Sequence, residues 1–187
     1  MIKKLKITKS LFSTLLILGI IGMMVGTSTE AGNTVTATVT PGNYSVAVSP
    51  ATADYSGMTL SATKTSATIT ATNDGSLASK FNIIGSDATY STYTWTQSTT
   101  APGTDTFVHA FSTKATAPTS GATLGTDPTT EWVSLDKTST YKTLVASVAA
   151  AGTQDFHLDM RTPTTAGAET SFGNEYSMSV TLQAVAP

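Results

Sequence analysis

The chain contains no cysteine and few charged side chains. Its 187 residues include ten lysines and arginines, twelve aspartates and glutamates, and two histidines. The lack of cysteine excludes a disulfide framework, a thiol nucleophile and a lipidated N-terminal cysteine. The few basic residues form no basic stripe of the kind that nucleic-acid-binding proteins use, so we expect no nucleic-acid partner.

Motifs of catalysis are missing as well. The sequence has no Gly-x-Ser-x-Gly elbow, no phosphate-binding loop and no dinucleotide-binding glycine pattern. The two histidines, His109 and His157, lie on separate predicted strands, which gives little support for a zinc site. His157 falls on the polar face of its strand and is expected in solvent, whereas His109, between two phenylalanines, is expected at the edge of the core. We therefore expect neither enzymatic activity nor a cofactor.

The first 31 residues have the layout of a secretory signal peptide. Four lysines lie within the first nine residues, an apolar run covers residues 11–25, and the small residues Thr29 and Ala31 precede a cut after Ala31. The alternatives are a retained membrane anchor and a pilin-type cut before the apolar run. The run is shorter than the roughly 20 residues that span a bilayer, and the residues before Leu11 lack the glycine usual at a pilin cut. We expect residues 1–31 to be removed and the protein to be secreted, extracellular or at the cell surface.

Cleavage changes the charge of the chain. It removes four of the ten basic residues and one of the twelve acidic ones, which leaves six and eleven and a net charge of −5. An acidic balance of this size favours solubility. The remaining 156 residues suffice for one domain, which would bury about 70% of its unfolded surface.

Composition and periodicity indicate an all-β fold. Threonine, whose branched Cβ favours strands, makes up about a fifth of the chain. Short alternating runs are separated by turn residues, and no helical periodicity extends beyond about two turns. We predict an antiparallel two-sheet sandwich, immunoglobulin-like or jelly-roll-like, over residues 42–187, with a closed barrel as the alternative.

The centre of the predicted fold is the stretch 66–84. Ile69 and Ala71 alternate with threonines, residues 73–76 (Asn-Asp-Gly-Ser) supply a turn, and Phe81 and Ile83 resume the apolar face. Alternation on both sides of a glycine turn predicts a β-hairpin.

The other segments of the chain are less regular. Residues 112–130 show no periodicity and are expected to form an exposed loop, with or without a small hairpin, and residues 141–151 fit either one helical turn or a strand. The remaining predicted strands are 34–40, 44–48, 58–60, 93–95, 107–111, 131–135, 154–161 and 175–185.

The strand pattern at 34–40 suggests a function. It is uncharged and apolar on one face only, through Val35, Ala37 and Val39, and Pro41-Gly42 follows as a hinge. Such a strand can pair within its own domain or add to the open sheet edge of a neighbour. A head-to-tail contact of the second kind builds a filament when its rotation does not close into a ring. Residues 32–41 are therefore a candidate donor strand.

Two other kinds of candidate site, a glycosylation site and a metal site, have weaker support in the sequence. Asn43 begins an Asn-Tyr-Ser glycosylation sequon. Aspartates at predicted turns cap their own backbone, although a structural Ca²⁺ ion in one of these loops stays an alternative. These aspartates are Asp54, Asp74, Asp87, Asp105 and Asp127.

Two motifs carry a resemblance to secreted immunoglobulin-like sandwich proteins. The run 70–83 (TATNDGSLASKFNI) resembles their strand–turn–strand signature, and 148–158 (VAAAGTQDFHL) resembles a later element of the same proteins. The layout of signal peptide, N-terminal strand and sandwich is similar to that of TasA- and camelysin-like biofilm-matrix fibre proteins and of archaeal bundling pilins. The resemblance implies a self-assembling structural protein that donates its N-terminal strand to the next subunit (donor-strand complementation). Camelysins are described as proteases, but no metalloprotease motif is present here.

We therefore expect the structural subunit of an extracellular, pilus-like filament, with itself as the main partner. The alternative is a monomeric cell-surface module that binds glycan or protein through Tyr90, Tyr93 or Trp95.

Overall fold

The computed structural model describes residue 39 and residues 41–187. The predicted signal peptide and most of the predicted donor strand, including Val35 and Ala37, lie outside the described residues. Val39 is described; it belongs to no strand and its side chain is 90% exposed. None of the described segments is a helix long and apolar enough to cross a membrane.

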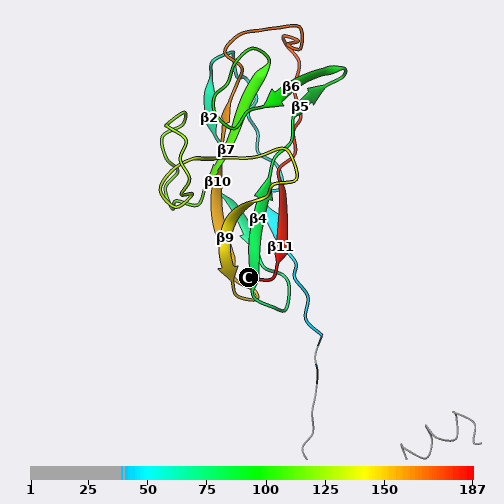
Figure 1. Cartoon of the computed structure of the whole chain (residues 1–187), viewed down its shortest axis with the longest axis vertical. Helices are drawn as coiled ribbons and strands as arrows, with labels where there is room; N and C mark the ends of the chain where they lie inside the picture. Colours follow the sequence, from blue (N-terminus) through cyan, green and yellow to red (C-terminus); the bar gives the residue numbers. More distant parts are fainter. Residues whose placement is uncertain (1–38, 40) are drawn as a thin grey trace, which may run out of the picture. The chain divides into compact units, whose positions relative to one another are not determined.

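Residues 41–187 fold into two sheets, and the predicted all-β two-sheet architecture is confirmed (Figure 1). The larger sheet has the order β1 (Ala47–Ser49), β3 (Ile69–Thr72), β10 (Thr153–Arg161), β7 (Thr106–Ser112), β6 (Tyr93–Gln97) and β5 (Ala88–Tyr90), with β2 (Thr63–Thr65) beside β10 and β8 (Val133–Ser134) beside β7. The smaller sheet has the order β11 (Thr181–Val185), β4 (Ser79–Ile84) and β9 (Lys142–Val148). These named strands pair antiparallel, except for a short parallel contact between β6 and β7.

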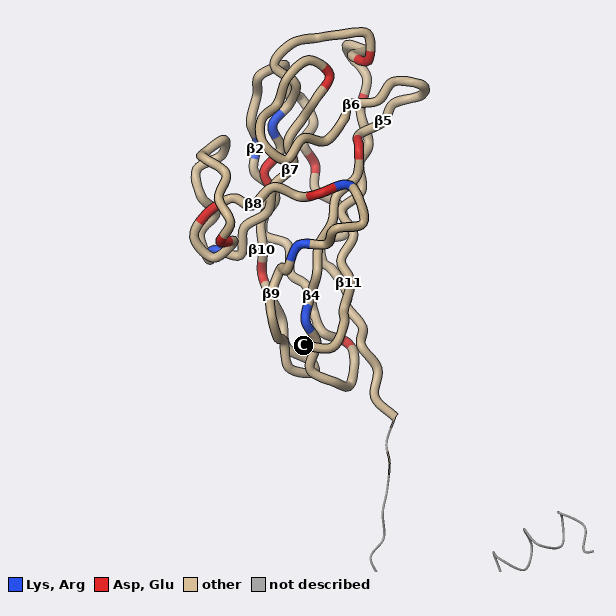
Figure 2. The backbone as a smooth tube through the Cα atoms, in the orientation of Figure 1, with Lys and Arg blue, Asp and Glu red and all other residues tan. Residues whose placement is uncertain are grey.

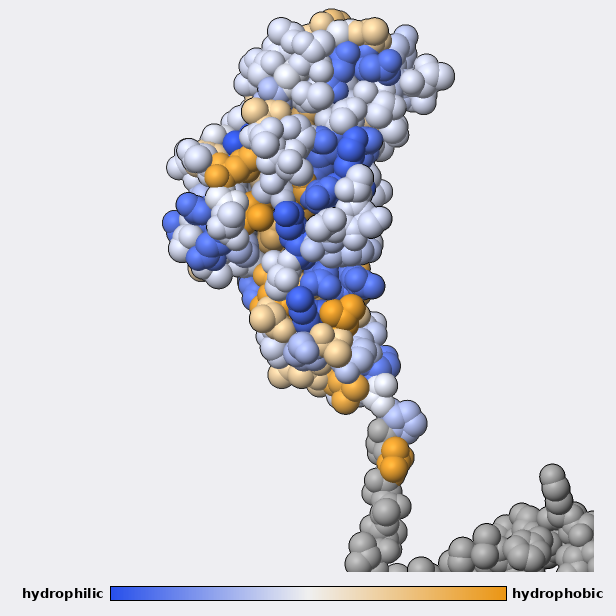
Figure 3. All heavy atoms as spheres, viewed as in Figure 1, coloured by the Kyte–Doolittle hydropathy of each residue, from blue (hydrophilic) through white to orange (hydrophobic). Residues whose placement is uncertain are grey.

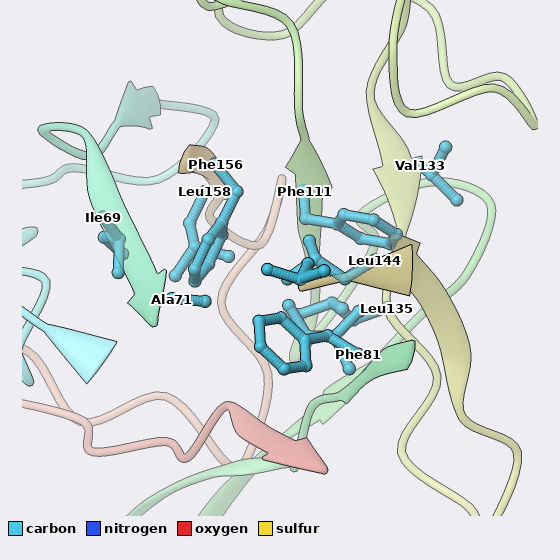
Figure 4. Close-up of a cluster of buried hydrophobic side chains, with 11 residues drawn as sticks. Ile69, Ala71, Phe81, Phe111, Val133, Leu135, Leu144, Phe156 and Leu158 are labelled. Atoms are coloured by element: carbon cyan, nitrogen blue, oxygen red, sulfur yellow. The ribbon is translucent and has the colours of Figure 1, made fainter. Parts of the chain in front are cut away.

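The main core lies between the two sheets. Ile69 and Ala71 of β3 and Phe156 of β10 face Phe81 of β4 and Leu144 of β9, and all five are buried (Figure 4). Period-two alternation places these side chains on one face of each strand. Burying each large apolar side chain stabilises the fold by roughly 1.5–3 kcal/mol.

The predicted hairpin at 66–84 is wrong in its pairing, although both strands and their buried faces are correct. β3 pairs with β1 and β10 in the larger sheet, whereas β4 pairs with β9 and β11 in the smaller one. Residues 73–78 therefore form an arch that carries the chain from one sheet to the other. The apolar faces of the two strands meet across the core because they lie in different sheets.

Asn73 explains why the chain turns into an arch. Its side chain is fully buried, and its amide nitrogen lies 2.9 Å from the carbonyl oxygens of Leu77 and Val148 and 3.1 Å from that of Ala149. Its side-chain oxygen accepts a hydrogen bond from the backbone N–H of Gly75. The amide thus satisfies carbonyls at the end of the sandwich that a tight hairpin would leave unpaired.

The segment 113–132, which we call the overlay loop, packs on the outer face of the larger sheet. Trp132 is fully buried and contacts Val108 and Ala110 of β7, with Ala122 and Leu124 beside them. Many residues of the predicted exposed loop 112–130 are exposed, but the expectation is wrong for Ala122 and Leu124, which are partly buried against the sheet. The overlay loop is also why β7 is buried on both faces.

The same layer corrects the prediction for His157. Its side chain is only 8% exposed, because the outer face of β10 is covered instead of solvated. Two further polar residues of that face, Asp159 and Arg161, are also buried and form an ion pair at 2.9 Å. From His157 to Arg161 the predicted polar face of β10 is thus a buried polar layer, whereas Asp155 at its start is exposed.

Several strand boundaries differ from the predictions. Residues 58–60 form no strand, and β2 follows them at Thr63–Thr65. The ambiguous segment 141–151 contains a strand, β9. β5, which pairs with β6, had no counterpart among the predicted strands. The last strand starts only at Thr181, yet alternate burial continues back to Tyr176.

Candidate functional site

A groove lies along one side of the sandwich, where β9 meets the overlay loop and the ends of β7 and β8. It has a volume of about 390 Å³. Phe111, Val133 and Leu144, all members of the main core, contribute its apolar lining. In Figure 3, apolar atoms reach the surface between the overlay loop and β9. These three side chains form a nearly closed floor, since Phe111 is fully buried and Leu144 and Val133 are buried, and the more exposed apolar lining comes from Val145 and Ala146 of β9.

β9 forms one wall of the groove with its edge. Five consecutive residues, 142–146, line the groove, so side chains of both faces and the backbone between them border it. Among the described residues β9 pairs only with β4, and its other edge has no strand partner. An edge of this kind presents N–H and C=O groups to an additional strand.

β9 is also irregular. Its register with β4 shifts on both sides of the Phe81–Val145 pair, as in β-bulges. As a result Leu144 is buried and the next residue, Val145, also packs against the core. Both line the groove, which widens the apolar surface that β9 offers.

The segment that precedes β1 is tied to the arch. The backbone N–H of Asn43 donates to the hydroxyl of Ser76 at 3.0 Å, and its side-chain oxygen accepts from the N–H and the hydroxyl of Ser76 at 3.1 Å. A Cβ on Gly75 would lie 2.5 Å from the carbonyl oxygen of Asn43, so only glycine permits this approach. A Cβ on Gly42 would likewise lie 2.4 Å from Cγ of Leu77. The candidate glycosylation site at Asn43 is exposed, but its side-chain carbonyl is engaged with the arch.

The aromatic residues of the alternative hypothesis form a ladder at the other end of the sandwich. Tyr93 and Tyr90 are parallel at 6.5 Å, and Trp95 stacks on Tyr176 at 4.1 Å. Tyr93 is 36% exposed, whereas Trp95 and Tyr176 pack against a second core cluster. The ladder is therefore partly a core element, and Tyr176 was not among the residues that the sequence singled out.

The turn aspartates act as caps for backbone and hydroxyl groups. Asp105 accepts hydrogen bonds from the N–H groups of Gly167 and Glu169 and from the hydroxyl of Thr170, and these bonds lower its pKa. Asp87 forms an ion pair with Lys137 at 3.0 Å. Within residue 39 and residues 41–187, no three of His, Cys, Asp and Glu come together as a metal site. Basic and acidic positions are interspersed along this part of the chain (Figure 2).

His109 lies inside the core and not at its edge, where it was expected. Its side chain is 2% exposed, and its Nε2 lies 3.1 Å from the hydroxyl of Tyr55. Burial lowers the pKa of His109 from 6.5 to about 4. The imidazole is therefore neutral in the folded protein at neutral pH, and the unfolded chain takes up its proton first on acidification.

We predict that acid destabilises the protein through His109. Between pH 6.5 and pH 4 the unfolded state binds a proton that the folded state does not. The free energy of unfolding therefore decreases by about 3 kcal/mol as the pH is lowered through this window. Urea denaturation at a series of pH values measures this slope. His109→Gln keeps a hydrogen-bonding partner for Tyr55 but does not titrate, and should lose most of the slope. An unchanged slope in this variant would show that another group is responsible. The aspartates with lowered pKa values do not account for this slope, because their contribution to stability is lost only at more acidic pH.

Neither a scan against protein-family models nor searches of curated proteins and of solved structures match the chain to a known protein. The resemblance to fibre proteins stays a prediction that rests on two motifs and a layout. The groove beside β9 was not anticipated, because it depends on which strands are neighbours.

Proposed function

We propose that the protein is the structural subunit of an extracellular filament, assembled when each chain donates its N-terminal strand to a neighbour. The observation that carries the proposal is that the described residues 41–187 contain two sheets around one main core, with open strand edges in the smaller sheet. The smaller sheet of this body has outer strands, β9 and β11, that pair on one side only within the described chain. Open edges of this kind, in a chain that also carries an uncharged strand pattern with one apolar face, suit strand addition.

The attachment of the N-terminal segment to the body supports the same proposal. A donated strand has to transmit load to its own subunit. The hydrogen bonds between Asn43 and Ser76, and the contact of Gly42 with Leu77, join the segment to the arch. Asn73 in turn holds the arch to the end of β9 through the carbonyl of Val148. The strand is thus linked to the core directly after the Pro41-Gly42 hinge.

Deleting the donor strand is expected to abolish assembly. We predict that the chain 32–187 forms filaments at micromolar concentration and that the chain 42–187 stays monomeric and folded. Negative-stain electron microscopy shows the filaments, and sedimentation velocity counts the monomers. Circular dichroism of the shorter chain controls for folding. Monomers from both chains, or filaments from both, would contradict the proposal.

A second candidate function is the binding of a glycan or protein by the aromatic ladder. It is favoured by the exposure of Tyr93 beside its parallel neighbour Tyr90 and by Phe172, which is 72% exposed. This function predicts a monodisperse monomer and a ligand whose binding is lost in Tyr93→Ala. It becomes the better explanation if the chain 32–187 does not polymerise.

A further inference from the structure

We propose that the groove beside β9 is the acceptor site for residues 34–40 of a second copy of this chain. This inference rests on the proposed function and adds the surface on which the donated strand docks. β1 and β5 are the outer strands of the larger sheet, but each has only three residues, so we compare the two longer outer strands of the smaller sheet, β9 and β11.

The apolar surface of the groove favours β9. A strand that adds to a sheet edge gains backbone hydrogen bonds, but a strand with one apolar face also needs an apolar surface against which to bury it. In the groove, the partly exposed Val145 and the exposed Ala146 provide such a surface, above a floor of Val133 and Leu144. Val35, Ala37 and Val39 form the apolar face of the donor. The side chain of Val39 is 90% exposed, so a neighbouring chain can bury it.

The length and chemistry of the two partners also agree. The donor pattern 34–40 and β9 each contain seven residues, about 23 Å of extended chain. The donor is uncharged, and the groove has a single charged lining residue, Lys142. The other lining residues at its border are mainly threonines, at positions 113, 126, 129 and 143. The second face of the donor, four threonines, can pair with hydroxyls or face solvent.

Engineered cysteines test the site directly, because the chain has none of its own. Thr38→Cys is combined in the chain 32–187 with Ala146→Cys, which is exposed and lines the groove. The control pair combines Thr38→Cys with Gln183→Cys, at an exposed position in the middle of β11. Filaments are treated with a mild oxidant or a short bis-maleimide and separated under denaturing conditions.

We expect a ladder of covalent oligomers from the groove pair at least tenfold stronger than from the β11 pair. A ladder from the β11 pair alone would overturn the groove as acceptor while leaving the filament intact. An internal cross-link that leaves only monomers would show that the strand pairs within its own chain. Microscopy of the same samples separates these results from a failure to polymerise, which would overturn the proposed function itself.

A second pair of variants needs no cross-linking. Ala146→Arg places a long charged side chain in the groove without disturbing a buried residue, and Gln183→Arg does the same at β11. We expect the first to raise the critical concentration for filaments more than tenfold and the second to leave it within twofold. Equal effects of the two variants, or a larger effect of Gln183→Arg, would overturn the proposal.

Discussion

Replacing Asn73 with alanine is expected to lower the free energy of unfolding by about 4 kcal/mol, because each buried polar group that loses its partner costs about 1–3 kcal/mol. The change removes the amide that contacts three carbonyls, those of Leu77, Val148 and Ala149, and the acceptor for the N–H of Gly75. These groups lie where the arch joins the two sheets, around a side chain that is itself fully buried. Urea denaturation followed by tryptophan fluorescence gives the value.

The neighbouring residue provides the control for Asn73. Asp74 is exposed, and Asp74→Ala should change stability by no more than about 0.5 kcal/mol. Asn73→Asp keeps the shape of the side chain but replaces a donor with an acceptor, and should destabilise the protein at neutral pH as strongly as the alanine variant. If Asn73→Ala unfolds as late as Asp74→Ala, the amide does not hold the arch.

Removing the carboxylate of Asp159 is expected to cost about 3–5 kcal/mol, the range seen when one partner of a buried ion pair is lost. Asp159 is fully buried and accepts hydrogen bonds from Arg161, from the hydroxyl of Ser120 at 2.6 Å and from the N–H of Gly121 at 3.1 Å. Asp159→Ala leaves the guanidinium of Arg161 buried without its partner and frees the overlay loop. We expect a lower midpoint in urea and faster proteolysis within residues 113–132.

Two comparisons identify the cause of that loss. The double variant Asp159→Leu with Arg161→Met removes both charges, and should recover part of the stability because no unpaired charge remains buried. The ion pair of Lys137 with Asp87 is about one-third exposed, so Lys137→Ala should cost less than about 1 kcal/mol. If the double variant is as unstable as Asp159→Ala alone, the lost contacts of the loop outweigh the unpaired charge.

Alternation was enough to predict which side chains of several strands face the core. Phe81 and Ile83 are buried on the expected face, and in the predicted strand 175–185 every second residue from Tyr176 to Ala184 is partly buried. Alternation is a property of one strand and does not say which strand lies beside it. The stretch 66–84 fits the pattern of a hairpin as well as that of an arch. The difference depends on Asn73, which donates to the carbonyl of Val148 at the end of β9 and to that of Ala149, 75 and 76 residues away.

The overlay loop was missed for a related reason. It has no periodicity of its own, and Trp132 is anchored by a contact between its indole N–H and the carbonyl of Thr119. One signal was present in β7, where residues 107–111 (FVHAF) contain only one polar side chain. A strand without polar alternation is typical of burial on both faces. The groove could not be predicted, since it is bordered by strands and loops whose proximity only the fold establishes.

Mixing the two chain lengths is the most direct test of strand donation. A chain 42–187 has the proposed acceptor groove but no donor strand, so it should add to one end of a growing filament and stop it there. We predict that the mean filament length in electron micrographs falls steadily as the fraction of chain 42–187 rises, with about one short chain per filament. Filament lengths that do not change with this fraction would contradict assembly by donation of the N-terminal strand.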